Sequence, residues 1–203
     1  MNYNNIDKEY YVMNFDGANN HPLLSWAKTD FTPFLAGALI SENTLTLPLE
    51  IVFSEPYPKE YQMPDLLMLD SCFAGSQKLK DLFEKSNISG VQFFPANITT
   101  NKKEVITGYY AINFANKLTA IDKNNYDGGP VNRFGNILRL NKFSLDENLL
   151  KNIPMQERKA FILKEKANIL LVHSDIANAI KEGDFDGITL IPVTEWNANS
   201  FFA

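Results

Sequence analysis

The side chains that could support nucleophilic catalysis in this sequence are one cysteine, Cys72, and two histidines, His21 and His173. A cysteine nucleophile needs a neighbouring base, usually histidine, to form its thiolate at neutral pH. Cys72 follows the apolar run LLMLDS, and His173 follows the apolar run ILLV. If these two predicted strands lie side by side, Cys72 and His173 can meet as the catalytic pair of a hydrolase or transferase. Because a lone cysteine commonly fills a core position, we instead expect Cys72 to be buried and far from His173.

Metal binding, nucleotide binding and acid–base catalysis have less support. The sequence contains no CxxC, HxH or HExxH spacing and no glycine-rich nucleotide motif. The segment DKNNYDGG lacks the regular acidic spacing and the closing glutamate of a calcium loop. Asp184 and Asp186 stand two positions apart in EGDFDG, and we interpret them as solvated turn residues. We therefore predict a protein that is not an enzyme and that has no cofactor and no metal.

The amino-acid composition restricts the fold class and the class of binding partner. The chain has 203 residues, of which 45% are hydrophobic and 12% aromatic, enough for a packed interior. We predict a single α+β domain over residues 1–203, in which residues 1–60 are the hardest to interpret. The net charge of −5 disfavours nucleic acid, which requires clustered Lys and Arg, and better suits a basic protein partner. The alternative is that it is the ordinary solubilising charge of a small domain.

Localisation follows from what the sequence lacks. A single cysteine excludes an internal disulfide, so no oxidising compartment is required. The first residues lack the basic and apolar stretches of a signal peptide, and the longest smooth apolar run, FLAGALI, is far shorter than the roughly 20 residues of a membrane helix. We therefore expect a cytoplasmic protein that does not associate with a membrane.

Two stretches of the chain share one pattern, GVQFFP at Gly90–Pro95 and GITLIP at Gly187–Pro192. Each follows a short segment that begins at a serine, Ser76 or Ser174, and carries apolar residues at i, i+3 and i+4. Serine is a favoured helix N-cap, and that spacing is typical of an amphipathic helix. The repeated pattern therefore predicts two helices, each followed by a glycine turn and by a strand that ends at its proline.

These helices belong to two predicted β-α-β units, at about residues 65–95 and 168–192. Between them, Glu104–Asp122 holds two β-rich runs, Asn136–Asp146 alternates apolar and polar positions, and Lys159–Lys166 is a further strand candidate, as in an antiparallel meander. The alternation slips in phase at Asn141–Lys142, which indicates a β-bulge. The elements together predict an α+β fold, mostly one mixed or antiparallel sheet with the helices packed on it.

The order of these elements resembles that of bacterial immunity proteins of polymorphic and contact-dependent toxin systems, in particular immunity families eleven and forty-three. The resemblance is carried by YYAIN with its downstream AID, by the LRL strand, and by the closing helix with GITLIP. It covers about Asp65–Pro192. It implies a non-enzymatic protein that binds a cognate toxin domain in the cytoplasm and blocks its active site or assembly. The Cys–His hydrolase or transferase and a small-ligand-binding regulatory α+β module are the alternatives, and the oligomeric state stays open.

The stretch Asp122–Gly135 is the clearest predicted long loop, with paired Asn, paired Gly and a Pro. Loops held by a rigid sheet commonly carry recognition, and this one combines aromatic side chains with charges, as binding hot spots do. We therefore expect the toxin to contact five of its residues: Asp122, Tyr126, Asp127, Arg133 and Phe134. The alternative is that this loop is a solvated surface loop with no role in binding.

Overall fold

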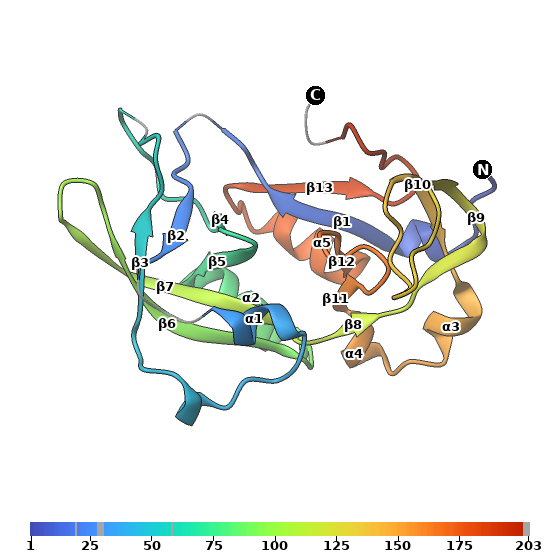
Figure 1. Cartoon of the computed structure of the whole chain (residues 1–203), viewed down its shortest axis with the longest axis horizontal. Helices are drawn as coiled ribbons and strands as arrows, with labels where there is room; N and C mark the ends of the chain where they lie inside the picture. The colour runs from blue at the N-terminus through green and yellow to red at the C-terminus, as the bar shows by residue number, and fades with distance from the viewer. Residues whose placement is uncertain (19, 28–30, 58, 201–203) are drawn as a thin grey trace. The chain divides into compact units, whose positions relative to one another are not determined.

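The structure is a computed structural model of the chain, and it describes residues 1–18, 20–27, 31–57 and 59–200. The protein is an α+β protein, as predicted (Figure 1). Its residues divide into two compact units. We call them the sheet unit, which comprises Met1–Asn14, Asn116–Ala179 and Leu190–Ala203, and the barrel unit, which comprises Phe15–Ala115 and Ile180–Thr189. The single domain over residues 1–203 stays a prediction.

The barrel unit is built on six strands that close on themselves in the order β2-β3-β6-β7-β5-β4. They are β2 (Leu24–Trp26), β3 (Leu49–Phe53), β4 (Leu66–Leu69), β5 (Cys72–Ser76), β6 (Val91–Thr99) and β7 (Val105–Phe114). Most neighbouring strands are antiparallel, whereas β3 with β6 and β2 with β4 are parallel. The helices of this unit are α1 (Thr32–Ala36), the 3-10 turn η2 (Glu42–Thr44) and α2 (Gln77–Lys85).

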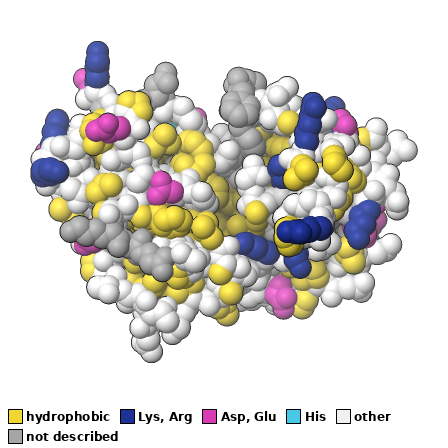
Figure 2. All heavy atoms as spheres, viewed as in Figure 1, with side chains coloured by type: hydrophobic (Ala, Val, Ile, Leu, Met, Phe, Trp, Pro, Cys, Tyr) yellow, Lys and Arg dark blue, Asp and Glu magenta, His cyan; other side chains and the backbone are white. Residues whose placement is uncertain are grey.

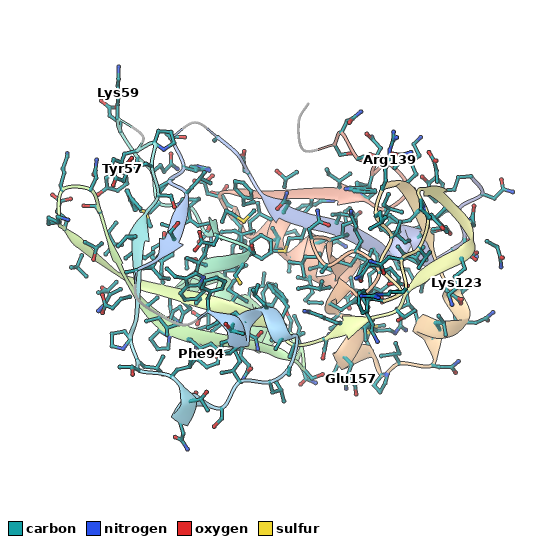
Figure 3. All side chains as sticks on the ribbon, in the orientation of Figure 1. Tyr57, Lys59, Phe94, Lys123, Arg139 and Glu157 are labelled. Atoms are coloured by element: carbon teal, nitrogen blue, oxygen red, sulfur yellow. The ribbon has the colours of Figure 1, made fainter. Side chains whose placement is uncertain are left out.

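The interior of the barrel is filled by side chains that alternate along its strands. Ile51, Leu69 and Ala74 are each fully buried there. Phe94 on β6, which is labelled in Figure 3, packs edge-on against Phe34 of α1, and the ring centroids are 5.5 Å apart. The period-2 alternation of the sequence therefore directs one face of each strand into a closed core.

The sheet unit contains a five-stranded sheet in the order β13-β1-β12-β11-β8 and a separate two-stranded sheet of β9 and β10. Its strands are β1 (Tyr10–Phe15), β8 (Lys117–Leu118), β9 (Ile121–Gly128), β10 (Leu140–Leu145), β11 (Ala160–Leu163), β12 (Leu170–His173) and β13 (Ile188–Pro192). The helical segments are η1 (Ile6–Glu9), α3 (Glu147–Lys151), α4 (Met155–Arg158) and α5 (Ser174–Glu182). Phe143, Phe161 and Leu171 are fully buried in its core.

The two predicted helix–glycine–strand segments are confirmed. The Ser76 side chain accepts a hydrogen bond from the Leu79 amide at the start of α2, and α5 begins at Ser174. The turn glycines Gly90 and Gly187 have φ of 76° and 73°, a left-handed conformation that glycine adopts without a steric penalty. The strands β6 and β13 follow them.

Both segments also share one topology, in which a third strand lies between the two strands that the helix connects. Strand β7 separates β5 from β6 and is antiparallel to both. Strand β1 separates β12 from β13 in the same way, since hydrogen bonds from Val193 to Tyr10 and from Asp16 to Gly187 place β13 antiparallel to β1. The joined strands are therefore parallel but not adjacent, and the repeat is a split β-α-β unit.

Four details differ from the sequence-based predictions. The apolar run before α2 is a hairpin of β4 and β5 that turns at Asp70, whose φ is 46°. Strand β6 continues past Pro95 to Thr99, because β3 pairs with β6 only from Ala96 onward and leaves one side of the proline unpaired. Over the described residues, the strands form three sheets rather than mostly one. The supposed long loop is strand β9 as far as Gly128.

The predicted bulge is confirmed. Residues Leu140 and Lys142 of β10 pair with Gly128 and Asp127 of β9, so one extra residue is accommodated between them. The interruption in apolar alternation at this point therefore reports a real break in strand register.

Candidate functional site

The residues that could form a catalytic pair occupy different units. Cys72 is buried in β5 and belongs to the barrel core, as expected. His173 ends β12 in the sheet unit, where its Nδ1 accepts a hydrogen bond from the Asp175 amide at 3.2 Å and its Nε2 lies 3.7 Å from a Glu9 carboxylate oxygen. The distance between Cys72 and His173 stays a prediction. Among the described residues, no three His, Cys, Asp or Glu side chains form a group that could hold a metal ion.

Asp186 is more than a solvated turn residue. Its side chain is 46% exposed, yet it accepts a hydrogen bond from Gln62 Nε2 at 2.6 Å and lies 3.8 Å from His21 Nε2. The carbonyl of Asp184 accepts a hydrogen bond from Lys78 Nζ at 2.6 Å. Both aspartates therefore stabilise the turn before Gly187.

The predicted contact residues lie on and beside the pair of strands β9 and β10, which we call the ribbon. Tyr126 on β9 is opposite Phe143 on β10 and packs against the core of the sheet unit. The segment from Gly129 to Arg139 connects the two strands, and its Val131 and Ile137 form an isolated β-bridge. The ribbon is thus anchored on one side by buried aromatic packing and presents a long connecting loop.

The structure brings together three of the five predicted contact residues. Tyr126 and Phe134 line the same cavity, and the Arg133 guanidinium lies 4.7 Å from the centre of the Phe134 ring. The remaining two serve local structure. The Asp122 side chain accepts a hydrogen bond from the Asn124 amide at 2.9 Å, and the Asp127 side chain accepts one from Asn141 Nδ2 at 3.3 Å.

This cavity, which we call the ribbon cavity, has a volume of about 240 Å³. Its apolar lining consists of Ile121, Tyr126, Val131, Phe134 and Ile137. Two exposed lysines, Lys123 and Lys164, also line it. The volume lies below the roughly 300–1,000 Å³ typical of small-molecule sites, so the cavity fits a side chain better than a drug-sized ligand.

Glu165 supplies the acidic group of the ribbon cavity. Its side chain is only 8% exposed, and Oε1 accepts hydrogen bonds from the amides of Ala120 and Ile121 at 3.0 and 3.1 Å. Its backbone carbonyl accepts a hydrogen bond from the Ile137 amide at 2.8 Å. The other oxygen, Oε2, is buried and has no hydrogen-bond partner among the residues that the structure describes.

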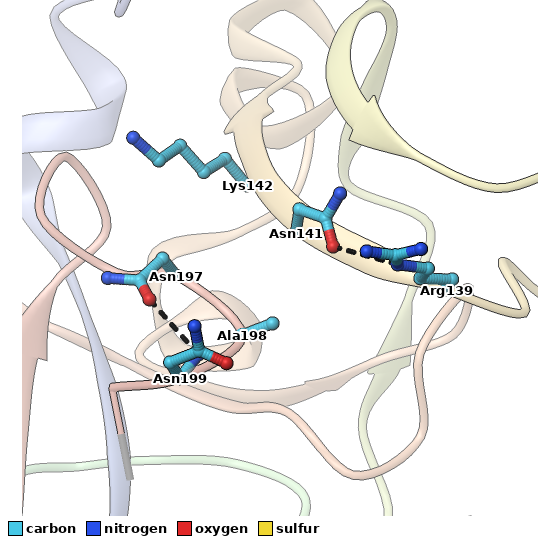
Figure 4. Close-up of a pocket in the computed structure, with 6 residues that line it drawn as sticks. All are labelled: Arg139, Asn141, Lys142, Asn197, Ala198 and Asn199. Atoms are coloured by element: carbon cyan, nitrogen blue, oxygen red, sulfur yellow. Dashed lines mark hydrogen bonds between the residues drawn. The ribbon is translucent and has the colours of Figure 1, made fainter. Parts of the chain in front are cut away.

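A second and wider cavity lies on the ribbon beside the C-terminal segment, and its volume is about 610 Å³ (Figure 4). Its lining combines basic and amide side chains with one alanine: Arg139, Asn141, Lys142, Asn197, Ala198 and Asn199. Arg139 Nε donates a hydrogen bond to Asn141 Oδ1 at 3.2 Å, and the Asn199 amide donates one to Asn197 Oδ1 at 3.0 Å. These amide and guanidinium groups suit a polar partner surface.

Exposed apolar side chains mark the connecting loop of the ribbon. Val131, Leu138 and Phe134 are 50%, 62% and 70% exposed. Residues 117–142 carry five basic and two acidic side chains, so this surface is locally positive although the chain is acidic overall. Figure 2 shows hydrophobic and basic side chains next to one another over the β8–β10 region, and Figure 3 shows Lys123 and Arg139 at the ribbon.

Sequence reasoning missed Glu165, Lys123 and Lys164. Glu165 stands between two lysines in LKEKAN, a pattern typical of an exposed turn, so its burial has no local signal. The apolar residues of GGPVNRFGNIL were a usable signal, because Val131 and Phe134 interrupt an otherwise polar loop. The cavity itself depends on the loop folding back onto β9, which is a tertiary contact.

Within the described part of the chain, no helix is both long enough and apolar enough to cross a membrane.

No curated protein matches the chain. The model of the Immunity protein family (Imm11) matches residues 13–195, which includes most of the N-terminal region that the sequence resemblance left out. Since this match spans nearly the whole sequence, the chain belongs to the immunity protein family Imm11.

Proposed function

We propose that this chain binds a cognate toxin protein in the cytoplasm and neutralises it by covering its active site or the surface through which it assembles. Membership of the immunity protein family is the observation that carries this proposal. The family implies a protein partner in general, and the burial of Cys72 in the barrel core supports a role through binding rather than through catalysis.

The ribbon is the contact surface that we propose. Stable protein interfaces combine aromatic anchors with arginine and a polar rim, and this surface carries Phe134, Arg133 and Tyr126 with lysines around them. Its strands are held by core packing of Tyr126 and Phe143, so little ordering is needed on binding.

The experiment is co-expression with a candidate toxin domain cloned from a neighbouring gene, read out as cell survival and as binding of the purified proteins. The wild-type chain is expected to protect cells. The double variant Arg133→Glu plus Phe134→Asp changes only exposed side chains, so the fold is expected to persist while binding falls at least about tenfold, as for a hot spot. Failure of the wild type to protect or bind contradicts the proposed function.

Two further variants test the position of the contact surface and the role of the cysteine. Tyr57→Ala plus Glu60→Lys alters an exposed aromatic and an exposed charge in the barrel unit, and it is expected to protect like the wild type. Full binding by the ribbon variant, with loss of binding by this control, would move the contact surface to the barrel unit. Cys72→Ala is expected to protect as well as the wild type, and a folded Cys72→Ala chain that fails to protect would favour the cysteine hydrolase.

A further inference from the structure

We propose that the ribbon cavity is a receptor for one tyrosine side chain of the partner, whose hydroxyl donates a hydrogen bond to Glu165 Oε2 while acidic partner residues pair with Lys123 and Lys164. This inference rests on the proposed function for the identity of the partner as a protein, and it adds the chemistry that the partner must present.

The cavity has room for an occupant much larger than one water molecule. A water molecule takes about 30 Å³ of liquid volume, so a cavity of about 240 Å³ is far larger than one water or one metal ion requires. The walls from Ile121, Val131, Phe134 and Ile137 are apolar, and apolar surfaces are stabilised by contact with an apolar body. A single large side chain with an aromatic or aliphatic body fits both observations.

The carboxylate of Glu165 determines what the tip of that side chain must be. Hydrogen bonds from Ala120 and Ile121 satisfy Oε1, whereas Oε2 has no partner among the described residues although it is buried. A buried acceptor without a partner destabilises the unbound protein, and a donor that enters the cavity removes this penalty. The occupant therefore carries a hydrogen-bond donor at the end of its apolar body.

The number and charge of donors favour tyrosine over arginine or lysine. One acceptor oxygen matches the one O–H of tyrosine, whereas the five N–H donors of arginine and the three of lysine would mostly stay unpaired in an apolar cavity. Lys123 and Lys164 line the same cavity, so they repel a cationic side chain and attract carboxylates. A tyrosine flanked by acidic residues supplies an aromatic ring to the apolar walls, a hydrogen-bond donor to Oε2 and carboxylates to the two lysines.

Access to Oε2 requires a small movement of the lining. Oε2 is shielded from solvent in the unbound chain, so the donor reaches it when an exposed lining side chain moves aside. Phe134, which is 70% exposed and lies on the connecting loop, is one such lining side chain.

The first experiment tests the cavity without any toxin. We would titrate the full chain with p-cresol, which reproduces the tyrosine side chain, and with toluene, which lacks the hydroxyl, and follow the methyl NMR signals of Ile121, Val131 and Ile137. The expected result is saturable shifts at these methyls and tighter binding of p-cresol than of toluene. In Glu165→Gln the Oε1 acceptor for the two amides is retained, and the preference for p-cresol is expected to fall about fivefold.

The same titration has a matched control variant. Glu157→Gln changes an exposed glutamate of the same unit and is expected to bind both probes like the wild type. Absence of shifts at the three methyls, or an equal p-cresol preference in wild type and Glu165→Gln, overturns the inference. Tighter binding of n-butylguanidine than of p-cresol also overturns it, because the receptor would then recognise arginine.

The second experiment uses the toxin complex. Each surface tyrosine of the toxin domain is changed to Phe, and its effect on the dissociation constant is measured with wild type and with Glu165→Gln. We expect one Tyr→Phe change to weaken wild-type binding about tenfold and to have little further effect in Glu165→Gln. A toxin that binds the wild type but shows no such coupling refutes the receptor and leaves the proposed function standing. A wild-type chain that binds no toxin refutes the proposed function. In that case the p-cresol titration still tests whether the cavity recognises a phenol.

Discussion

Asp65 and Asp186 are joined by reciprocal hydrogen bonds in the barrel unit. The Asp65 amide donates to the Asp186 carbonyl at 3.0 Å, and the Asp186 amide donates to Asp65 Oδ2, also at 3.0 Å. Asp65 also accepts a hydrogen bond from the Ser76 hydroxyl, which in turn caps α2. One carboxylate therefore connects the start of β4, the start of α2 and the turn before β13.

Replacement of Asp65 by Asn is expected to destabilise the fold. The amide group of Asn either places a donor against the Asp186 amide or reverses the bond with the Ser76 hydroxyl, and it removes the negative charge that lies 3.7 Å from Lys78 Nζ. We expect the free energy of unfolding to fall by about 2 kcal/mol, measured by urea denaturation. Asp81→Asn on the accessible side of α2 is the matched control, with an expected change of about 0.5 kcal/mol or less. Equal effects of the two variants would refute the role of Asp65.

Gly187→Ala is expected to destabilise the protein more than Gly108→Ala. Both glycines have positive φ, 73° and 82°, so both substitutions incur the backbone penalty of about 1–2 kcal/mol. A Cβ at Gly187 would also lie 2.4 Å from Pro64 Cβ and 2.8 Å from the Leu66 carbonyl, whereas a Cβ at Gly108 meets open space. Thermal unfolding of the two variants measures the difference, and equal melting temperatures would contradict the close packing at Gly187.

The phenol of Tyr109 is expected to titrate far above its usual range. Burial raises the pKa of Tyr109 to about 12, and the nearby carboxylates of Asp65 and Asp186 act on this pKa in the same direction. Its hydroxyl donates to the carbonyls of Met63 and Pro64, both at 3.0 Å, which also favours the protonated form.

Stability should therefore depend on pH in the alkaline range. Below pH 10, Tyr109 is protonated in both the folded and the unfolded chain, so its contribution is fully present. Between pH 10 and about 12 the unfolded chain loses this proton first, so the free energy of unfolding falls as pH rises. Comparison of wild type with Tyr109→Phe by denaturation at each pH isolates the effect, and parallel curves above pH 10 would contradict it.

Charge reversal at the ribbon cavity is expected to slow association with the toxin. Lys123→Glu plus Lys164→Glu removes the local positive charge that would steer an acidic contact surface. We expect the association rate constant at low salt to fall about tenfold, with a smaller change at high salt, measured by stopped-flow fluorescence. Lys85→Glu plus Lys102→Glu in the barrel unit is the control. A faster association of the ribbon variant would indicate a basic contact surface on the toxin, as the net charge of −5 suggested.

The sequence alone determined where helices start, where glycine turns lie and where a strand is bulged, because each depends on neighbouring residues. Ser76 caps α2, α5 begins at Ser174, and Gly90 and Gly187 take left-handed conformations, because helix starts and φ depend on one or two residues. The bulge between Leu140 and Lys142 was visible for the same reason, since side-chain alternation reports strand register directly.

Only the tertiary structure decided which strands pair and which polar side chains are buried. The closure of six strands into a barrel, the strand inserted in each split β-α-β unit, and the division into three sheets all depend on contacts between distant residues. Alternation specifies that a strand has a buried face and does not specify its neighbour. At the candidate site, the burial of Glu165 could not be predicted from the sequence either, because its two lysine neighbours indicate an exposed turn. Its carboxylate is held in the interior by the amides of Ala120 and Ile121, which are more than forty positions away.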